Sequence, residues 1–237
     1  MQRRDLRRCI FKKRAQEHDL KPTTILFDLD GTLTDPGLGI TNSVMHALRR
    51  MGIQPPEREA LYKFIGPPLK WSFHEYYGFD DAQCEEAIVR YREHFADKGL
   101  FENELYPAVP GMLQALRDAG LRLAVATSKP EPFSERIIDH FGLTPYFEAV
   151  CGSTLEETRT EKWEVIQYAL ELLGVTPAET VMVGDREHDV LGAKKCGVRC
   201  IGVLYGYGSR EELEAAGTAA IAESPEQVAE IVLRGKF

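Results

Sequence analysis

Two aspartates stand two positions apart where an apolar run gives way to a glycine turn. Asp28 and Asp30 follow the run of residues 24–27 and precede Gly31. In an extended strand, residues two apart point to the same side, so both carboxylates can face a pocket beyond the strand end, where open α/β sheets bind ligands. Two neighbouring carboxylates repel each other, so the pocket favours a cation, and Mg2+ suits oxygen ligands. The plain alternative is a strand-to-turn junction without chemistry, because Asp and Gly are common in turns.

Further polar groups are placed in a related way later in the chain. Thr127 and Ser128 end one apolar run, Asp185 and Asp189 follow another, and Lys162 comes after a polar stretch. If the strands are parallel neighbours, their carboxyl ends bring these groups to one rim of the sheet. An acid pair, a hydroxyl, a lysine and a second acid pair form a set that phosphate chemistry needs, since phosphoryl transfer depends on positioning and on cations.

Each of these residues also has an interpretation without chemistry. Thr127 fits a threonine at the edge of the core, and Asp189 fits an N-cap of the helix that follows it. Lys162 fits a solvated lysine at a helix start, with Lys129 as its nearby competitor for a catalytic role. The combination, rather than any single residue, indicates a reaction centre.

With these motifs in this order, the chain resembles a haloacid dehalogenase superfamily phosphatase of the phosphoglycolate phosphatase type. The motifs are residues 28–33 (Asp-Leu-Asp-Gly-Thr-Leu), Thr127, Lys162 and residues 184–189 (Gly-Asp-Arg-Glu-His-Asp), and the resemblance covers residues 23 to about 225. It implies an α/β fold with a Rossmann-like, mainly parallel sheet flanked by helices and an inserted small helical cap.

The resemblance also implies a role for each matching residue. Asp28 is the nucleophile that becomes an aspartyl-phosphate, and Asp30 is the acid and then the base. Thr127, the Ser128 backbone N–H and Lys162 bind the phosphoryl group. The chemistry agrees, because a carboxylate that attacks a phosphate dianion needs cations to offset the repulsion. The second acid, Asp30, favours phosphoryl transfer over carbon–halogen cleavage, which needs no proton on the leaving group.

Mg2+ is the cofactor that the resemblance implies. Its expected ligands are the side chains of Asp28 and Asp185, the backbone carbonyl of Asp30, and Asp189 directly or through water. Such a set of oxygen ligands with retained waters is what Mg2+ prefers.

Apolar runs that are typical of strands alternate with helical patterns from residue 21 onward. This alternation predicts βα units with right-handed crossovers and a mainly parallel sheet. The runs lie at residues 23–28, 122–127, 149–152, 181–184 and 199–204, and the helical patterns at about 109–119, 131–141, 162–173 and 189–196. We expect residues 21–35 and 108–237 to form this core, residues 36–107 to form the cap, and residues 1–20 to be a basic extension.

The cap carries helical patterns at 40–51, 57–64, 69–77 and 81–98. The loop of residues 65–70 is its best candidate for substrate contact, because its prolines are rigid and Lys70 could reach a second anionic group. A plain helix connector is equally compatible with Pro and Gly. Related capped phosphatases often have Arg where Lys70 stands, which would cost bidentate recognition. The aromatic residues of 71–77 could stack a nucleobase, although aromatics at helical spacing usually pack inward.

Composition limits the other classes of protein. The 237 residues are 43% apolar and carry a net charge of −8, which argues against general nucleic-acid binding. The five cysteines contain no Cys-x-x-Cys pair and indicate reduced thiols in a cytoplasmic protein. No apolar stretch approaches the length of a membrane span. Residues 1–20 hold seven Arg or Lys against three acids, which fits a short amphipathic helix or a loosely docked extension.

The sequence therefore predicts a Mg2+-dependent phosphatase that hydrolyses a small phosphorylated metabolite, phosphoglycolate or a nucleoside 5'-monophosphate, through an aspartyl-phosphate. One alternative is a phosphosugar mutase of the β-phosphoglucomutase kind, which returns the phosphoryl group to a sugar. Another is a non-catalytic binding or regulatory module that docks through its basic extension.

Overall fold

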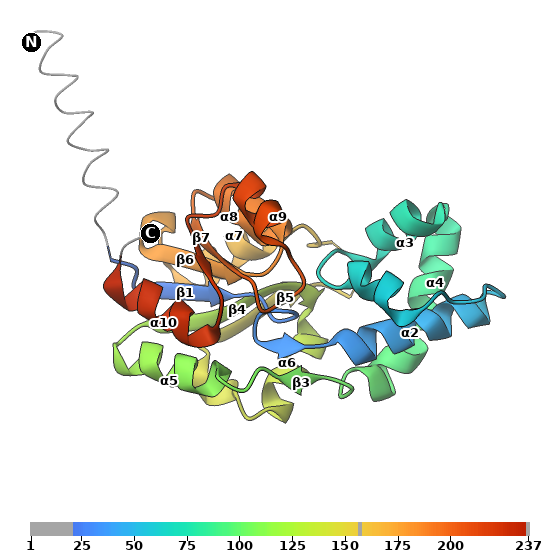
Figure 1. The fold of residues 1–237 in the computed structure, drawn as a ribbon, viewed down its shortest axis with the longest axis horizontal. Coiled ribbons are helices and arrows are strands. Elements are labelled where there is room, and N and C mark those ends of the chain that lie inside the picture. Colours follow the sequence, from blue (N-terminus) through green and yellow to red (C-terminus); the bar gives the residue numbers. More distant parts are fainter. Residues whose placement is uncertain (1–20, 156–157, 236–237) are drawn as a thin grey trace, which may run out of the picture.

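The computed structural model describes residues 21–155 and 158–235, and they form a six-stranded parallel sheet with helices on both faces (Figure 1). The strand order is β5-β4-β1-β6-β7-β8, and every neighbouring pair is parallel. The strands are β1 (Thr24–Phe27), β4 (Arg122–Pro130), β5 (Ala149–Ser153), β6 (Thr180–Gly184), β7 (Arg199–Val203) and β8 (Ala220–Ala222).

Strand β1 lies in the middle of the sheet and is fully buried. Its side chains alternate between two hydrophobic clusters, with Ile25 and Phe27 in one and Leu26 in the other. A strand covered on both faces needs apolar residues at every position, which explains its continuous apolar run. Phe27 pairs with Val125 on one side and Val183 on the other, so β1 and β6 end at nearly the same level, whereas β4 runs on to Pro130.

Three helices cover each face of the sheet, and each trio packs into one of the two clusters. One trio is α5 (Val109–Asp118), α6 (Glu131–His140) and α10 (Pro225–Arg234), and the other is α7 (Lys162–Leu173), α8 (Glu187–Lys195) and α9 (Arg210–Ala216). Short 3-10 turns, η3 (Thr144–Tyr146) and η4 (Pro177–Glu179), lead into β5 and β6. The predicted α/β architecture is confirmed.

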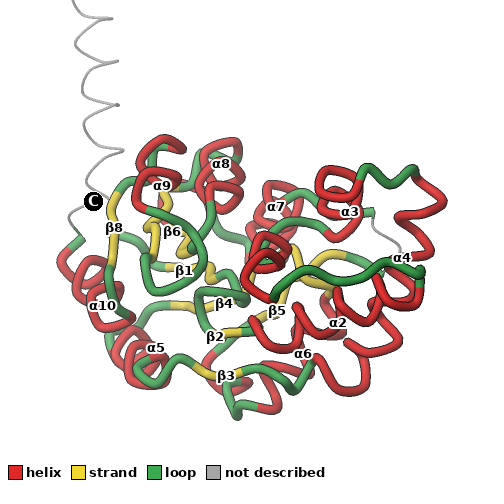
Figure 2. The backbone as a smooth tube through the Cα atoms, turned by 45° about the vertical axis from the view of Figure 1, so that its right-hand side comes forward, coloured by secondary structure: helices red, strands yellow, loops and turns green. Residues whose placement is uncertain are grey.

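The helices that follow β1 and come before residue 100 form a separate layer beside the sheet, at the right of Figure 1 and in Figure 2. We call residues 37–99 the helical insert. It contains α2 (Gly37–Arg50), the 3-10 helix η1 (Arg58–Phe64), α3 (Leu69–Tyr77), α4 (Asp81–His94) and the π-helical turn η2 (Phe95–Gly99). These elements coincide with the four predicted helical patterns, whereas the division of the chain into domains stays a prediction.

A two-stranded antiparallel ribbon connects the helical insert to the core. It pairs β2 (Thr34–Asp35) with β3 (Glu104–Leu105). Next to it, α2 approaches η2 so closely that a Cβ on Gly39 would lie 1.9 Å from the carbonyl oxygen of Gly99. A glycine is therefore required at position 39, and the insert begins and ends at one point.

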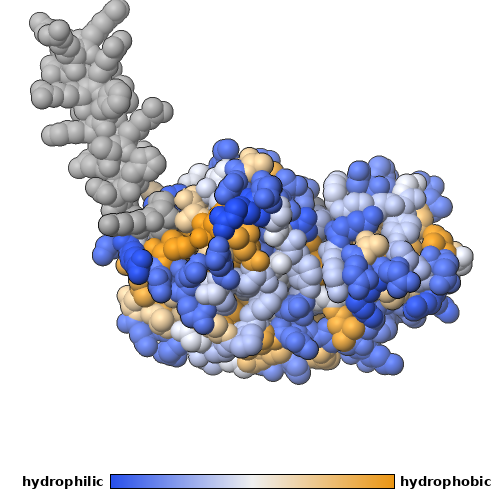
Figure 3. Space-filling model, in the orientation of Figure 1, coloured by the Kyte–Doolittle hydropathy of each residue, from blue (hydrophilic) through white to orange (hydrophobic). Residues whose placement is uncertain are grey.

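The surface in Figure 3 is mostly hydrophilic with separate apolar patches, and a notch divides the sheet-bearing body from the helical insert. Among the described residues, none of the helices combines the length and the apolar character needed to cross a membrane. The predicted basic extension, residues 1–20, lies outside the described residues.

Candidate active site

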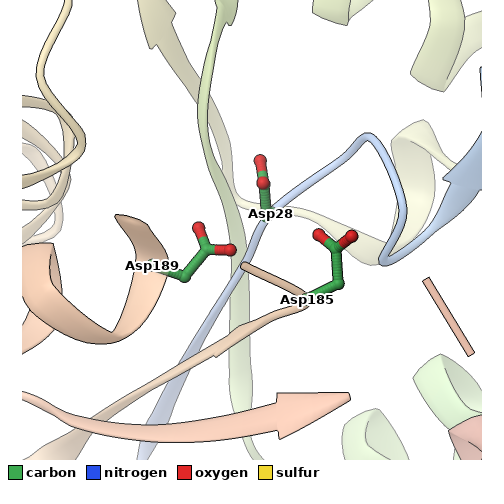
Figure 4. A group of neighbouring side chains, drawn as sticks. All are labelled: Asp28, Asp185 and Asp189. Carbon is green, nitrogen blue, oxygen red and sulfur yellow. The ribbon is translucent and has the colours of Figure 1, made fainter. Parts of the chain in front are cut away.

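Three aspartates meet at the carboxyl end of the central strands (Figure 4). Asp28 follows β1, Asp185 follows β6, and Asp189 lies in the first turn of α8. One carboxylate oxygen of each lies within 4.8 Å of the others, and all three residues are buried. The level ends of β1 and β6 explain this meeting, because the residue after each strand projects beyond the same edge.

Main-chain atoms and glycines enclose the Asp185 carboxylate. The Tyr207 backbone N–H donates to Asp185 Oδ2 over 2.8 Å. Gly31 has φ of +79°, and a Cβ there would lie 2.2 Å from the same oxygen. A Cβ on Gly206 would lie 2.5 Å from Asp185 Cβ. Only glycines fit at these two positions, which explains the glycine after the first acid pair.

The acidic cluster suits a hard cation, because all three donors are carboxylate oxygens in a buried pocket. Burial raises the pKa of Asp185 well above its ordinary value, and the charges of Asp189 and Asp28 add to this effect. Burial also raises the pKa of Asp189 to about 6, against the opposing charge of Lys162. A bound cation would offset the unfavourable burial and repulsion of the ionised carboxylates, so the residues fit the predicted Mg2+ site.

Lys162 is the first residue of α7, and its ammonium group reaches into the cluster. Its Nζ lies 2.8 Å from Asp28 Oδ1 and 2.8 Å from Asp189 Oδ1. It also donates to the carbonyl oxygen of Ala126 over 3.3 Å. Burial alone would lower the Lys162 pKa, but the two carboxylates outweigh it and hold that pKa above its ordinary value. Lys162 is therefore a buried cation beside the proposed nucleophile.

Asp30 is paired with a different lysine. Lys129 Nζ lies 2.7 Å from Asp30 Oδ1 and 2.5 Å from Oδ2, and 4.9 Å from the centre of the Phe95 ring. Burial raises the Asp30 pKa, and the charge of Lys129 opposes this shift. Lys129 is therefore no competitor of Lys162 for the same acid, because Lys129 contacts Asp30 whereas Lys162 contacts Asp28 and Asp189. The missed signal is the spacing from Thr127, because residues two apart in a strand share a side.

Thr127 and Ser128 lie within β4 rather than after it, because this strand runs to Pro130. Its register with β5 shifts between Ala126 and Pro130, which marks an irregular backbone there. The Thr127 hydroxyl oxygen accepts a hydrogen bond from the Lys129 N–H over 3.3 Å. Thr127 is buried, and Ser128 lines the cavity described next.

A cavity of about 600 Å³ lies between the sheet end and the helical insert. The core contributes Asp30, Ser128 and Lys129 to its wall, and the insert contributes residues of the loop predicted to contact substrate. Lys70 lines the cavity, and its Nζ lies 3.1 Å from Asp81 Oδ1. The structure thus places Lys70 on the other side of the cavity from the aspartates, paired with an acid of the insert.

The aromatic residues of α3 divide between the two predicted roles. Phe73 is buried and packs on Phe64 at a ring distance of 5.1 Å, as expected for a residue of the insert core. Trp71 is 45% exposed and lines the cavity. It also contacts His188 of α8 at a ring distance of 6.2 Å. His188 is partly buried, and burial lowers its pKa.

Asp189 is not the N-cap of its helix. Arg186 occupies that position, and Asp189 Oδ2 accepts a hydrogen bond from the Arg186 backbone N–H over 3.1 Å. The carboxylate thus closes the first turn of α8 with one oxygen and faces Lys162 with the other. The structure brings Asp28, Asp185, Asp189 and Lys162 into one cluster, and it places Asp30 and Ser128 on the wall of the cavity, while the role of each stays a prediction.

The chain matches a family model described as haloacid dehalogenase-like hydrolase over residues 25–203. It is 50% identical to a 5'-nucleotidase of Pseudomonas aeruginosa over 196 residues, which cover 83% of this chain and 89% of that protein. It is 32% identical to phosphoglycolate phosphatase 1 of the same organism over 227 residues, covering 90% and 83%.

Two other comparisons extend this result. The chain is 39% identical to the tyrosine-protein kinase PtkA of Mycobacterium tuberculosis over 209 residues, which cover 88% of this chain and 71% of that protein. The crystal structure of a predicted phosphatase from Clostridium acetobutylicum matches 91% of this chain and 99% of its own, with a TM-score of 0.88 and 46% identity. The family match and the phosphatase relatives agree with the geometry of the site, and the chain therefore belongs to the haloacid dehalogenase-like hydrolase family, as one of its phosphatases.

Proposed function

We propose that this phosphatase is Mg2+-dependent and hydrolyses a small phosphomonoester through an aspartyl-phosphate on Asp28. The observation that carries the proposal is the position of the Asp28 carboxylate. It lies 2.8 Å from the Lys162 ammonium group and beside the carboxylates of Asp185 and Asp189, at the end of the buried central strand β1. A nucleophile held so firmly needs little reorganisation to attack a phosphorus atom.

The reaction has two covalent steps. A carboxylate oxygen of Asp28 attacks phosphorus, the bond from phosphorus to the ester oxygen breaks, and Asp30 gives its proton to the leaving alcohol. Asp30 then takes a proton from water as the water attacks the aspartyl-phosphate, which frees inorganic phosphate and restores Asp28. Lys162 offsets the repulsion between the Asp28 carboxylate and the phosphate of the substrate, and Lys129 orients Asp30.

Asp28, Asp185 and Asp189, with the backbone carbonyl of Asp30, are the residues that would hold Mg2+. When bound, the cation would supply positive charge to the phosphoryl oxygens. The Thr127 hydroxyl and the Ser128 N–H would donate to the same oxygens, in line with their place on β4 beside β1.

A nucleoside 5'-monophosphate is the substrate that we favour over phosphoglycolate. The relative named 5'-nucleotidase is 50% identical to this chain, compared with 32% for the relative named phosphoglycolate phosphatase 1. A cavity of about 600 Å³ is also far larger than glycolate requires. Trp71, at the cavity wall, offers a stacking surface for a base, a contact worth roughly 1–3 kcal/mol.

Residues 36–107 act as the cap in this proposal. A helical cover over the sheet end would keep water out while the aspartyl-phosphate forms and admit it afterwards. The reduced thiols of Cys151, Cys196 and Cys200 support a cytoplasmic location.

Release of inorganic phosphate from a set of esters tests the function. The set contains 2-phosphoglycolate, the nucleoside 5'-monophosphates and glucose phosphates, each with Mg2+ and again with EDTA. We expect turnover of nucleotides that stops on chelation. Asp28→Asn should lose at least about 1000-fold in kcat with an unchanged circular dichroism spectrum, because an amide is no nucleophile here. Turnover of Asp28→Asn at the wild-type rate would refute the covalent mechanism.

A phosphotransferase is the second candidate, favoured by the relative named a tyrosine-protein kinase. Such an enzyme shares the phosphorylated aspartate but passes the phosphoryl group to an acceptor other than water. A phosphosugar mutase differs in the same way. Inorganic phosphate formed in equal amount to the alcohol released excludes both, whereas a phosphorylated protein or an isomerised sugar phosphate identifies one of them.

A further inference from the structure

Arg186 joins the core to the helical insert beside the acidic cluster. It directly follows Asp185 and is the N-cap residue of α8. Its Nη1 donates a hydrogen bond to the backbone carbonyl oxygen of Ile65 over 2.7 Å. Its Nε donates to Glu212 Oε1 on α9 over 2.8 Å. One guanidinium group therefore holds a core helix and a loop of the insert at once.

The insert loop is shaped to receive this side chain. Gly66 has φ of +102°, a conformation that favours glycine. A Cβ at that position would lie 3.0 Å from Arg186 Cγ, so the loop lies directly against the stem of Arg186. Pro67 and Pro68 then fix the backbone that follows. A rigid loop transmits the position of its contact point to the residues after it.

The residues that follow the contact form one wall of the cavity. Gly66, Pro67, Pro68, Leu69, Lys70 and Trp71 all line it. The Trp71 ring also meets His188, two residues beyond Arg186, at a centroid distance of 6.2 Å. The distance between the cavity wall and the sheet end is therefore set at the first turn of α8.

The same turn is tied to the acidic cluster. The Arg186 backbone N–H donates to Asp189 Oδ2 over 3.1 Å, and the Glu187 N–H donates to Glu212 Oε1 over 2.8 Å. Glu212 thus fixes both the backbone of this turn and the guanidinium group. Arg186 links an acid of the cluster, through its backbone, to the insert loop, through its side chain.

We propose that Arg186 is a latch that closes the loop of residues 65–68 onto the core and thereby positions the substrate over Asp28. It acts through the loop and is a positioning residue rather than a catalytic one. This inference rests on the proposed function, since it assigns the closure of the same site. Misplacement of a substrate by about 1 Å can cost roughly 100-fold in rate, so loss of the latch should be visible in kcat/KM.

The test removes the contact from both sides. Arg186→Met takes away the donors and keeps an apolar stem, whereas Gly66→Ala places a Cβ 3.0 Å from Arg186 Cγ and strains the loop at a φ of +102°. With p-nitrophenyl phosphate and Mg2+, we expect each change to lower kcat/KM by roughly 10- to 100-fold. Arg186→Lys keeps one donor and should recover part of the loss. Arg210→Met changes an exposed residue of α9; it is the matched control and should stay within about twofold of wild type in kcat/KM.

A double variant separates a latch from two independent defects. If both changes open the same contact, Arg186→Met with Gly66→Ala should be no worse than the poorer single variant, within about twofold. If the two losses multiply, the proposal is overturned. Wild-type kcat/KM in Arg186→Met overturns it as well.

Hydrogen exchange measures the closure without turnover. In Arg186→Met, amides of residues 62–72 should exchange at least about tenfold faster than in wild type, while amides of β1 keep their rate. Unchanged exchange in this loop refutes the latch even if the chain hydrolyses no ester. If wild type releases phosphate and Arg186→Met does so at the same kcat/KM, the latch is refuted and the proposed function stands.

Discussion

Four buried aspartates and two buried lysines lie at the carboxyl end of the sheet. When the three aspartates of the acidic cluster and Lys162 are ionised, three negative charges and one positive charge leave a net charge of −2, which one divalent cation neutralises. The pairs are unequal, because Lys129 contacts one acid and Lys162 contacts two; the acids are Asp28, Asp30, Asp185 and Asp189. The charge of the cluster therefore supports the proposed cation independently of its ligand geometry.

Lys162→Met should damage both activity and stability. The change leaves Asp28 and Asp189 buried without their shared cation, and breaking a buried pair typically costs about 3–5 kcal/mol. We expect the free energy of unfolding in urea with EDTA to fall by about that amount, and kcat to fall by at least about 100-fold. Gln167→Met, on the exposed face of α7, is the control and should alter neither quantity. A stability equal to wild type would show that Lys162 does not hold the cluster together.

At the residue scale, the sequence was a good guide to the groups that sit directly at strand ends. Asp28 and Asp185 could be predicted, because a strand end fixes where the next side chain goes. The partner of Asp30 could not be separated from that of Asp28, since Lys129 and Lys162 are both competent cations in the sequence. Only the direction in which each side chain runs shows that Lys129 meets Asp30.

At the element scale, α2 approaches η2 closely at Gly39. Gly39→Val should push these elements apart, because its Cβ would lie 1.9 Å from a backbone oxygen that cannot move aside. Overpacking of this kind costs about 1–3 kcal/mol or more, which urea unfolding measures. Gly111→Ala in α5 meets nothing within 4 Å and is the control, expected to be neutral or stabilising by up to about 1 kcal/mol. Equal stability of both variants would contradict the contact.

Helices and strands with long periodic patterns were predictable, whereas short ones were not. The helix α7, predicted over 162–173, has these bounds in the structure. The edge strand β8 has only three residues, Ala-Ile-Ala, and was not among the predicted runs. It forms because β7 offers it a parallel partner, a long-range condition that local patterns do not contain.

For the whole molecule, the raised carboxyl pKa values predict a pH-dependent response to metal. Burial raises the pKa of Asp30, Asp185 and Asp189 above the ordinary 3.8, the last to about 6. The folded chain then binds more protons than the unfolded chain between about pH 4 and 6, so these groups lower the stability of the metal-free protein as pH rises.

A cation would reverse this loss, because it binds the ionised carboxylates and releases their protons. We expect 5 mM MgCl2 to raise the unfolding temperature more at pH 7 than at pH 5, measured against EDTA. Asp185→Asn should abolish the difference. An equal or larger effect of Mg2+ at pH 5 would contradict the assignment of the acidic cluster as the metal site.

Contacts between the helical insert and the core were beyond sequence reasoning. Arg186 and Ile65 are 121 positions apart, and neither residue type announces the hydrogen bond. The acceptor is a backbone carbonyl, which every residue has, so no pattern of side chains marks it. The loop predicted to contact substrate lines the cavity, but the residue that holds it was not foreseen.

The walls around Asp185 consist largely of peptide groups and glycines, together with the Thr32 hydroxyl. Few substitutions there can change the shape of the acidic cluster without destroying it. New preferences can arise only on the opposite wall, where the insert supplies Trp71, Lys70 and their neighbours. The acidic cluster therefore keeps its shape, and substitutions in the helical insert are what change the alcohol that the cavity accepts.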